Sequence, residues 1–252
     1  MATPPAVPTV LTWTWPQYFA AVVRNHGRPT RFYGPLPVWT VRAPGWSSSS
    51  ILQELDTSQG TVRTARQAGT FAGLSSAALD QVAGFGDPRL RWLGYMGRGP
   101  WPGRIRNNPA LLDGLLHHTP GIPPLTALQG ISTVTGPAGY PIQSLVTPIH
   151  WLTMVDPGHY FPVTSTNQCR MKQPWALGCY PTTHGAYDHL WRRVQHARWM
   201  TAPSPRLTFS AWKRWHCGRM RLPASRRPPR NLTCRIWAAR AAYLDALFYD
   251  PK

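Results

Sequence analysis

Four residues of the kinds that bind zinc lie close together in the sequence: His159, Cys169, Cys179 and His184. Zinc prefers four Cys or His ligands at the corners of a tetrahedron, and the Cys-x4-His spacing of the last two suits ligands from one turn. The first two are too far apart to match the close pairs of standard structural sites. A zinc site is therefore one hypothesis, and a chance grouping among nine histidines is the alternative.

The most catalytic-looking group in the chain lies in the same region and comprises Cys179, His184, Asp188 and His189. A histidine can activate a cysteine thiol as a nucleophile, but closeness in sequence does not provide the spatial arrangement that this needs. The chain lacks GxSxG, HExxH and GxGxxG patterns, and it has only nine acidic side chains. We therefore expect a protein that is not an enzyme and has no cofactor, zinc excepted.

Basic and tryptophan residues alternate toward the C-terminal end. The candidate nucleic-acid-binding residues are Arg192, Arg193, Arg198, Trp212, Lys213, Arg214, Trp215, Arg219, Arg221, Arg226, Arg227 and Arg230. Guanidinium groups neutralise phosphates, and indole rings stack on unpaired bases at about 1–3 kcal/mol each. This combination favours single-stranded nucleic acid. The alternatives are that the tryptophans anchor a small core, and that residues 226–230 serve nuclear import.

The positive charge is concentrated in the same part of the chain. The formal net charge is +18, and residues 189–243 contain 13 Lys or Arg and no Asp or Glu. Such a balance predicts attraction to polyanions, of which nucleic acid is the first candidate. An arginine-rich coding sequence would give the same charge without any binding partner, and that alternative stays open.

The composition suggests an unusual origin. The chain has 24 arginines, 28 prolines and 13 tryptophans but only three lysines and one glutamate, whereas Lys and Glu are common in globular domains. Residues with G/C-rich codons are plentiful and those with purine-rich codons are scarce. We interpret this bias as the mark of an overlapping reading frame in a compact viral genome.

Several features bear on location. Four scattered cysteines are too few for a disulfide scaffold, prolines interrupt each apolar run near the N-terminus, and no stretch approaches 18 consecutive apolar residues. We expect an intracellular protein in the host cytoplasm or nucleus, without a transmembrane segment.

Prolines and glycines dominate the expected fold. With 28 Pro and 21 Gly, the composition favours a small, irregular α+β domain with short helices and minor β elements. We expect a Pro-rich arm over residues 1–10, a mixed body over 11–187, and a basic helical extension over 188–252.

Local patterns place the individual elements. Helices are expected from Trp15 to Gly27, over 51–55, from Ser75 or Ser76 to Gly84, from Asn108, from Asp188 to about Met200, and over 233–248. Short β segments are expected at 31–33, 38–41, 131–134, 144–146 and 150–155. The helix after Asp188 should bury Leu190, Trp191, Val194 and Ala197 and expose its arginines.

Two short segments resemble viral interaction motifs. Residues 140–145 (YPIQSL) resemble a YPxnL late-domain peptide, and residues 127–132 (ALQGIS) resemble the SLQ-type box with which lentiviral Vif proteins hold a cullin ligase adaptor. Here the box precedes the Cys/His cluster, whereas in the primate viruses it follows. The leading functional hypothesis is a viral accessory protein that binds nucleic acid. The alternatives are a host-factor adaptor that recruits a ubiquitin ligase, and a basic capsid or assembly-assisting protein.

Overall fold

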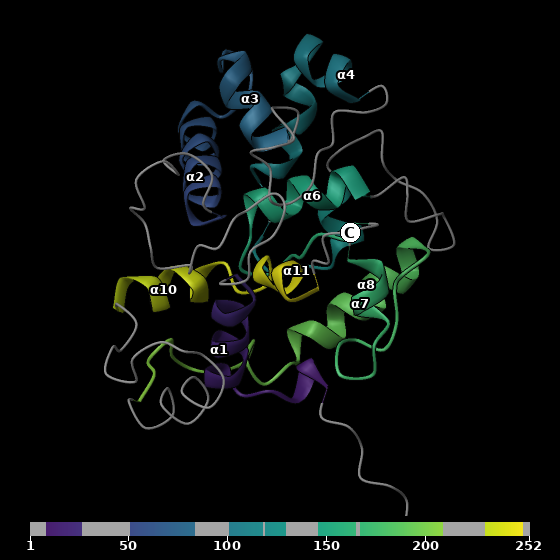
Figure 1. Ribbon diagram of the computed structural model, residues 1–252. Helices are drawn as coiled ribbons and strands as arrows, with labels where there is room; N and C mark the ends of the chain where they lie inside the picture. The colour runs from purple at the N-terminus through teal and green to yellow at the C-terminus, as the bar shows by residue number, and fades with distance from the viewer. Residues whose placement is uncertain are drawn as a thin grey trace, which may run out of the picture.

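The computed structural model describes residues 9–26, 51–83, 101–117, 119–129, 146–164, 167–208 and 230–248. In this part of the chain, short helices surround one hydrophobic core without a sheet (Figure 1). The helices, with η marking 3-10 helices, are η1 (Val10–Thr12), α1 (Trp15–His26), α2 (Ile51–Ala68), α3 (Ser76–Ala83), α4 (Trp101–Asn107), η3 (Pro109–Leu115), α5 (Pro124–Leu128), α6 (Val146–Val155), α7 (Gln168–Met171), α8 (His184–Gln195), α10 (Arg230–Ala238) and α11 (Tyr243–Phe248).

The expected α+β fold with minor β elements is wrong, because the structure is mostly helical. The clearest correction concerns residues 150–155, which the sequence predicts as a β segment and which form the second half of α6. Every residue of α6 from Pro148 onward is buried. A short segment that is buried on all sides shows no helical period, so its sequence cannot distinguish a buried helix from a buried strand. The predicted β segments 31–33, 38–41 and 131–134 lie outside the described residues, and so does 144–146 except for Val146, which begins α6.

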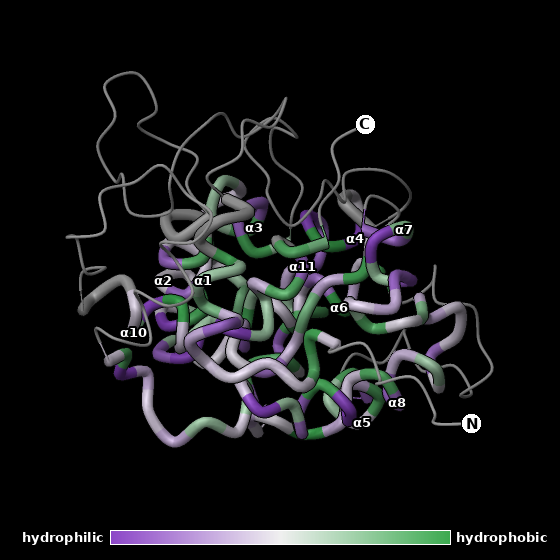
Figure 2. The backbone as a smooth tube through the Cα atoms, turned by 60° about the horizontal axis from the view of Figure 1, so that its bottom comes forward, coloured by the Kyte–Doolittle hydropathy of each residue, from purple (hydrophilic) through white to green (hydrophobic). Residues whose placement is uncertain are grey.

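Two helices lie in the middle of the molecule. α6 packs against α2, α3 and α5, and α11 packs against α1 and α7. Both lie centrally in the two views of Figures 1 and 2. The largest fully buried side chains include Trp151, Trp199, Tyr18, Tyr160 and Tyr187. Aromatic residues therefore supply much of the core.

The beginning and the end of the described chain belong to the same core. The indole Nε1 of Trp199 donates to the carbonyl of Val10 at 3.0 Å, and Trp15 Nε1 donates to the carbonyl of Pro205 at 3.0 Å. The rings of Tyr18 and Trp199 stack with their centroids 3.9 Å apart. α1 is therefore fixed by partners about 190 residues later in the chain.

Several helix boundaries match local signals and others do not. α1 begins at Trp15, and the Ser75 hydroxyl accepts from the Ala78 amide at 3.2 Å at the start of α3, both as the sequence predicts. The expected short helix at 51–55 is the start of an 18-residue helix, α2. The expected helix over 233–248 is two helices, because residues 239–242 turn and the Ala242 amide donates to the Pro157 carbonyl at 2.9 Å.

No helix in the described ranges combines the length and the apolar character needed to cross a bilayer.

Candidate nucleic-acid interface

α8 carries two of the predicted nucleic-acid-binding residues, Arg192 and Arg193. Thr183 caps its N-terminus, with its hydroxyl accepting from the Ala186 amide at 3.2 Å. The sequence predicts Asp188 in that role, but Asp188 lies inside the helix. Both residue types are good N-caps. Of these two residues, however, only Thr183 has the extended backbone that precedes a helix.

The two faces of α8 differ as its amphipathic pattern predicts. Leu190, Trp191 and Val194 are buried, whereas Arg192 and Arg193 are exposed. Ala197 and Arg198, just beyond the helix, continue the pattern, one buried and the other exposed. The arginines thus stand on the outer surface of an element whose other face belongs to the core. We call Arg192, Arg193 and Arg198 the α8 arginines.

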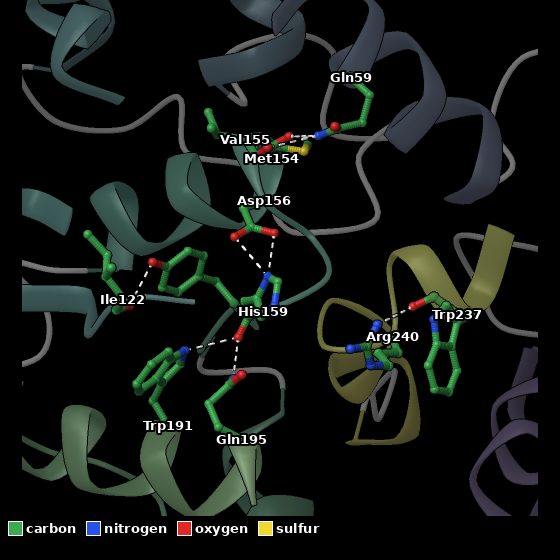
Figure 3. Close-up of polar contacts among 11 residues, drawn as sticks. Gln59, Ile122, Met154, Val155, Asp156, His159, Trp191, Gln195, Trp237 and Arg240 are labelled. Carbon is green, nitrogen blue, oxygen red and sulfur yellow. Dashed lines mark hydrogen bonds and ion pairs between the residues drawn. The ribbon is translucent and has the colours of Figure 1, made fainter. Parts of the chain in front are cut away.

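Side-chain hydrogen bonds hold α8 against residues 159–161, which follow α6 in the chain. Trp191 Nε1 and Gln195 Nε2 both donate to the His159 carbonyl, at 3.0 and 2.8 Å (Figure 3). The Tyr187 hydroxyl donates to the Phe161 carbonyl at 2.8 Å. These three bonds fix the rotation of α8 about its axis, and so they keep Arg192 and Arg193 on its outward face.

The turn at 156–159 is itself held from several sides. His159 Nδ1 lies 2.9 Å from a carboxylate oxygen of Asp156 (Figure 3). Gln59 Nε2, from α2, donates to the Met154 carbonyl and, at 3.3 Å, to the Val155 carbonyl, at the end of α6. The turn therefore links α2, α6 and α8, and it provides a rigid base for the basic surface.

The α8 arginines differ in their local partners. Arg192 Nε lies 2.8 Å from Asp188 Oδ2, so part of its charge is neutralised. Arg193 Nη1 lies 3.9 Å from the Cys179 sulfur, a weak hydrogen-bond acceptor. Within the described part of the chain, neither Arg193 nor Arg198 forms an ion pair. These two guanidinium groups are therefore the ones available to an anionic ligand.

The other predicted nucleic-acid-binding residues are not placed on this surface. Arg230 is the first residue of α10. The remaining residues lie outside the described part of the chain, and they are Trp212, Lys213, Arg214, Trp215, Arg219, Arg221, Arg226 and Arg227.

The structure does not bring the four predicted zinc ligands together. No group of three or more His, Cys, Asp or Glu side chains among the described residues could hold a metal ion. His159 pairs with Asp156, and His184 is buried in the first turn of α8. Cys179 contacts Arg193 and the Leu177 carbonyl, while Cys169 is exposed on α7.

Sequence reasoning missed the residues that position α8. Gln195 has no local signal of its role, because its acceptor, the His159 carbonyl, lies 36 residues earlier in the chain. The amphipathic pattern places Trp191 on the packed face, but its hydrogen bond to the same carbonyl depends on the same tertiary contact.

No protein-family model, no curated protein and no solved structure matches this chain.

Proposed function

We propose that this protein is a non-enzymatic accessory protein, from an overlapping reading frame of a virus, that binds nucleic acid and prefers single strands. The observation that carries the proposal is the exposed set of α8 arginines, with Arg192 and Arg193 on a helix fixed to the core and Arg198 just beyond its end. It stands at the start of residues 189–243, which hold 13 Lys or Arg and no acidic residue.

The physical argument rests on phosphate neutralisation. Arginine forms paired hydrogen bonds with phosphate oxygens, and each contact releases counterions from the nucleic acid. Because α8 is fixed to the core, it presents Arg193 on the surface without a cost for ordering the backbone at binding, and Arg198, just beyond the helix, is exposed as well. Trp212 and Trp215, outside the described residues, would add stacking on unpaired bases. Such a protein would act in the host cytoplasm or nucleus, where viral and cellular nucleic acids lie.

The structure gives less support to recruitment of a ubiquitin ligase through the box-like segment 127–132. Its first two residues, Ala127 and Leu128, are 4% and 1% exposed, since they end α5 and face the core. A docking box needs its apolar side chains on the surface. Within this segment, the buried leucine therefore favours a structural role.

Binding to a single-stranded RNA without a terminal phosphate, measured across a salt series, tests the proposal. The informative variant is Arg193→Ala with Arg198→Ala, because neither side chain balances a carboxylate in the described structure. We expect the salt slope to fall by roughly 0.7 for each phosphate that the variant no longer neutralises. Trp212→Ala with Trp215→Ala should weaken binding by about 1–3 kcal/mol per stacked base.

The charge-matched control is Arg63→Ala with Arg66→Ala, which removes two exposed arginines from α2. α2 and α8 lie on opposite sides of the molecule (Figure 1). An equal decrease of affinity in both double variants would show that only total charge matters, and the proposed interface would then be rejected.

A further inference from the structure

A cavity of about 360 Å³ lies between α2, α10 and the turn that follows α6. This volume is within the range of sites that bind small molecules. One part of its wall is apolar and consists of Leu55, Pro120, Val155, Pro157, Ala238 and Ala239. Such a wall suits the flat ring of an organic ligand better than a bare ion.

The rest of the wall is polar, and apart from Gln59 it is charged. Arg63 and Arg66 from α2 and Arg235 from α10 line the cavity together with Asp56 and Asp156. Asp56 forms an ion pair with Arg235, and Asp156 binds His159 Nδ1 at 2.9 Å. Each carboxylate thus has a cationic or hydrogen-bonding partner inside the protein.

Arg63 and Arg66 are the two arginines of the cavity wall that no carboxylate pairs with in the described part of the chain. They are three residues apart on one helix, which places their side chains on the same face. A Cβ at Gly60 would lie 3.8 Å from Arg63 Nη2, so the Arg63 side chain extends back along α2 as far as Gly60.

We propose that this cavity binds a small organic phosphate of mononucleotide size. The phosphate would lie between the guanidinium groups of Arg63 and Arg66, which match its oxygens with paired hydrogen bonds. The base would pack on the apolar wall formed by Val155 and its neighbours. The Asp56 and Asp156 carboxylates would accept hydrogen bonds from sugar hydroxyls or amino groups.

This site is separate from the proposed nucleic-acid interface. α2 and α10 lie at one side of the molecule and α8 at the other (Figure 1). The same phosphate chemistry has two sources, a free mononucleotide and the phosphorylated end of a nucleic-acid strand, and the experiment separates them.

The test is calorimetric titration of the full chain with adenosine 5′-monophosphate and, in parallel, with adenosine. The nucleotide should bind roughly tenfold more tightly or better, because charge-assisted hydrogen bonds to the phosphate are absent from the nucleoside. Arg63→Ala with Arg66→Ala should remove that preference, and Arg63→Lys with Arg66→Lys should restore part of it. Both side chains are exposed, so a thermal unfolding midpoint close to the parent protein is expected and serves as the folding check.

The matched control is Arg193→Ala with Arg198→Ala, which should bind the nucleotide as the parent protein does. A short RNA with a 5′-phosphate, compared with the same RNA carrying a 5′-hydroxyl, shows whether a strand end competes for the cavity. Equal affinity for nucleotide and nucleoside, or unchanged nucleotide binding in the Arg63/Arg66 variant, would overturn the proposal. Neither result would affect the test of the α8 arginines, so the two proposals fail separately.

Discussion

Asp245 is a carboxyl group buried inside the helical core. It lies in the first turn of α11 and is 2% exposed. Asn167 Nδ2 donates to it and, at 3.3 Å, to the Pro162 carbonyl. Burial raises the pKa of Asp245 to about 7, and the Asn167 hydrogen bond opposes this effect without cancelling it. The protonated, neutral form is therefore the one that suits the core.

This raised pKa predicts a specific pH dependence of stability. Because the pKa of Asp245 is higher in the folded than in the unfolded chain, its contribution is fully present below about pH 4 and is lost as the pH rises to about 7. Asp245→Asn should remove this slope and leave the variant more stable than the parent protein at pH 8. Urea unfolding at pH 5 and pH 8 measures the difference. Identical pH slopes in the two proteins would show that Asp245 ionises freely in the fold.

At the scale of elements, Gly158 allows the turn after α6 to approach the end of α10. A Cβ at Gly158 would lie 2.9 Å from the Ala238 carbonyl oxygen, a backbone atom that cannot move alone. By contrast, a Cβ at Gly60 in α2 would meet only the flexible end of Arg63, at 3.8 Å. The same substitution should therefore have opposite effects at the two positions.

Gly158→Ala should lower the free energy of unfolding by about 1–3 kcal/mol, because the turn and α10 must separate to admit the methyl group. Gly60→Ala, the matched control, should raise it by roughly 0.5–1 kcal/mol, because alanine is the better helix former. Denaturant unfolding measures both. A stable Gly158→Ala variant would mean that α10 does not lie against this turn.

Local signals located some elements and failed at others for physical reasons. α1 and α3 begin with a proline or a serine cap, which act within one turn and can be read from the sequence. The helical character of α6 could not be read, because its burial on all sides removes the pattern that distinguishes a helix from a strand. The break between α10 and α11 depends on the Pro157 carbonyl, which is about 80 residues distant and leaves no local trace.

In the candidate sites, too, local patterns could be predicted from the sequence and tertiary contacts could not. The outward face of α8 follows from its amphipathic pattern, so Arg192 and Arg193 could be predicted as exposed. The cavity could not be predicted, because Arg235 lines the same cavity as Arg63 and Arg66 only through the packing of α10 near α2. The zinc hypothesis relied on sequence spacing alone, and the described structure holds His159 and His184 in separate environments.

At the scale of the whole molecule, residues on both sides of position 188 share one core. Tyr18 stacks on Trp199, its hydroxyl donates to the Arg240 carbonyl, and α1 packs against α11. A chain that ends at Tyr187 would therefore lack a large part of its aromatic core. The aromatic core therefore contains residues from both the predicted body, 11–187, and the predicted extension, 188–252.

We expect a chain ending at Tyr187 to lack cooperative thermal unfolding and near-ultraviolet circular dichroism, since α1 would have neither Trp199 nor α11 to pack against. A chain ending at Phe248, which retains every described residue, is the control. Cooperative unfolding of the shorter chain would establish residues 11–187 as an independent domain.

The pairing of α1 with residues 199 and 240 also determines when the protein can fold during synthesis. α1 leaves the ribosome about 200 residues before these partners do. At a translation rate of about 5–20 residues per second, on the order of 10–40 s pass before the residues that pack against α1 have been synthesised. During that interval the nascent chain exposes Trp15, Tyr18 and Phe19, all of which are buried in the folded protein. Chaperones that hold exposed aromatic segments should therefore associate with this protein while it is being translated and release it only after α11 has emerged.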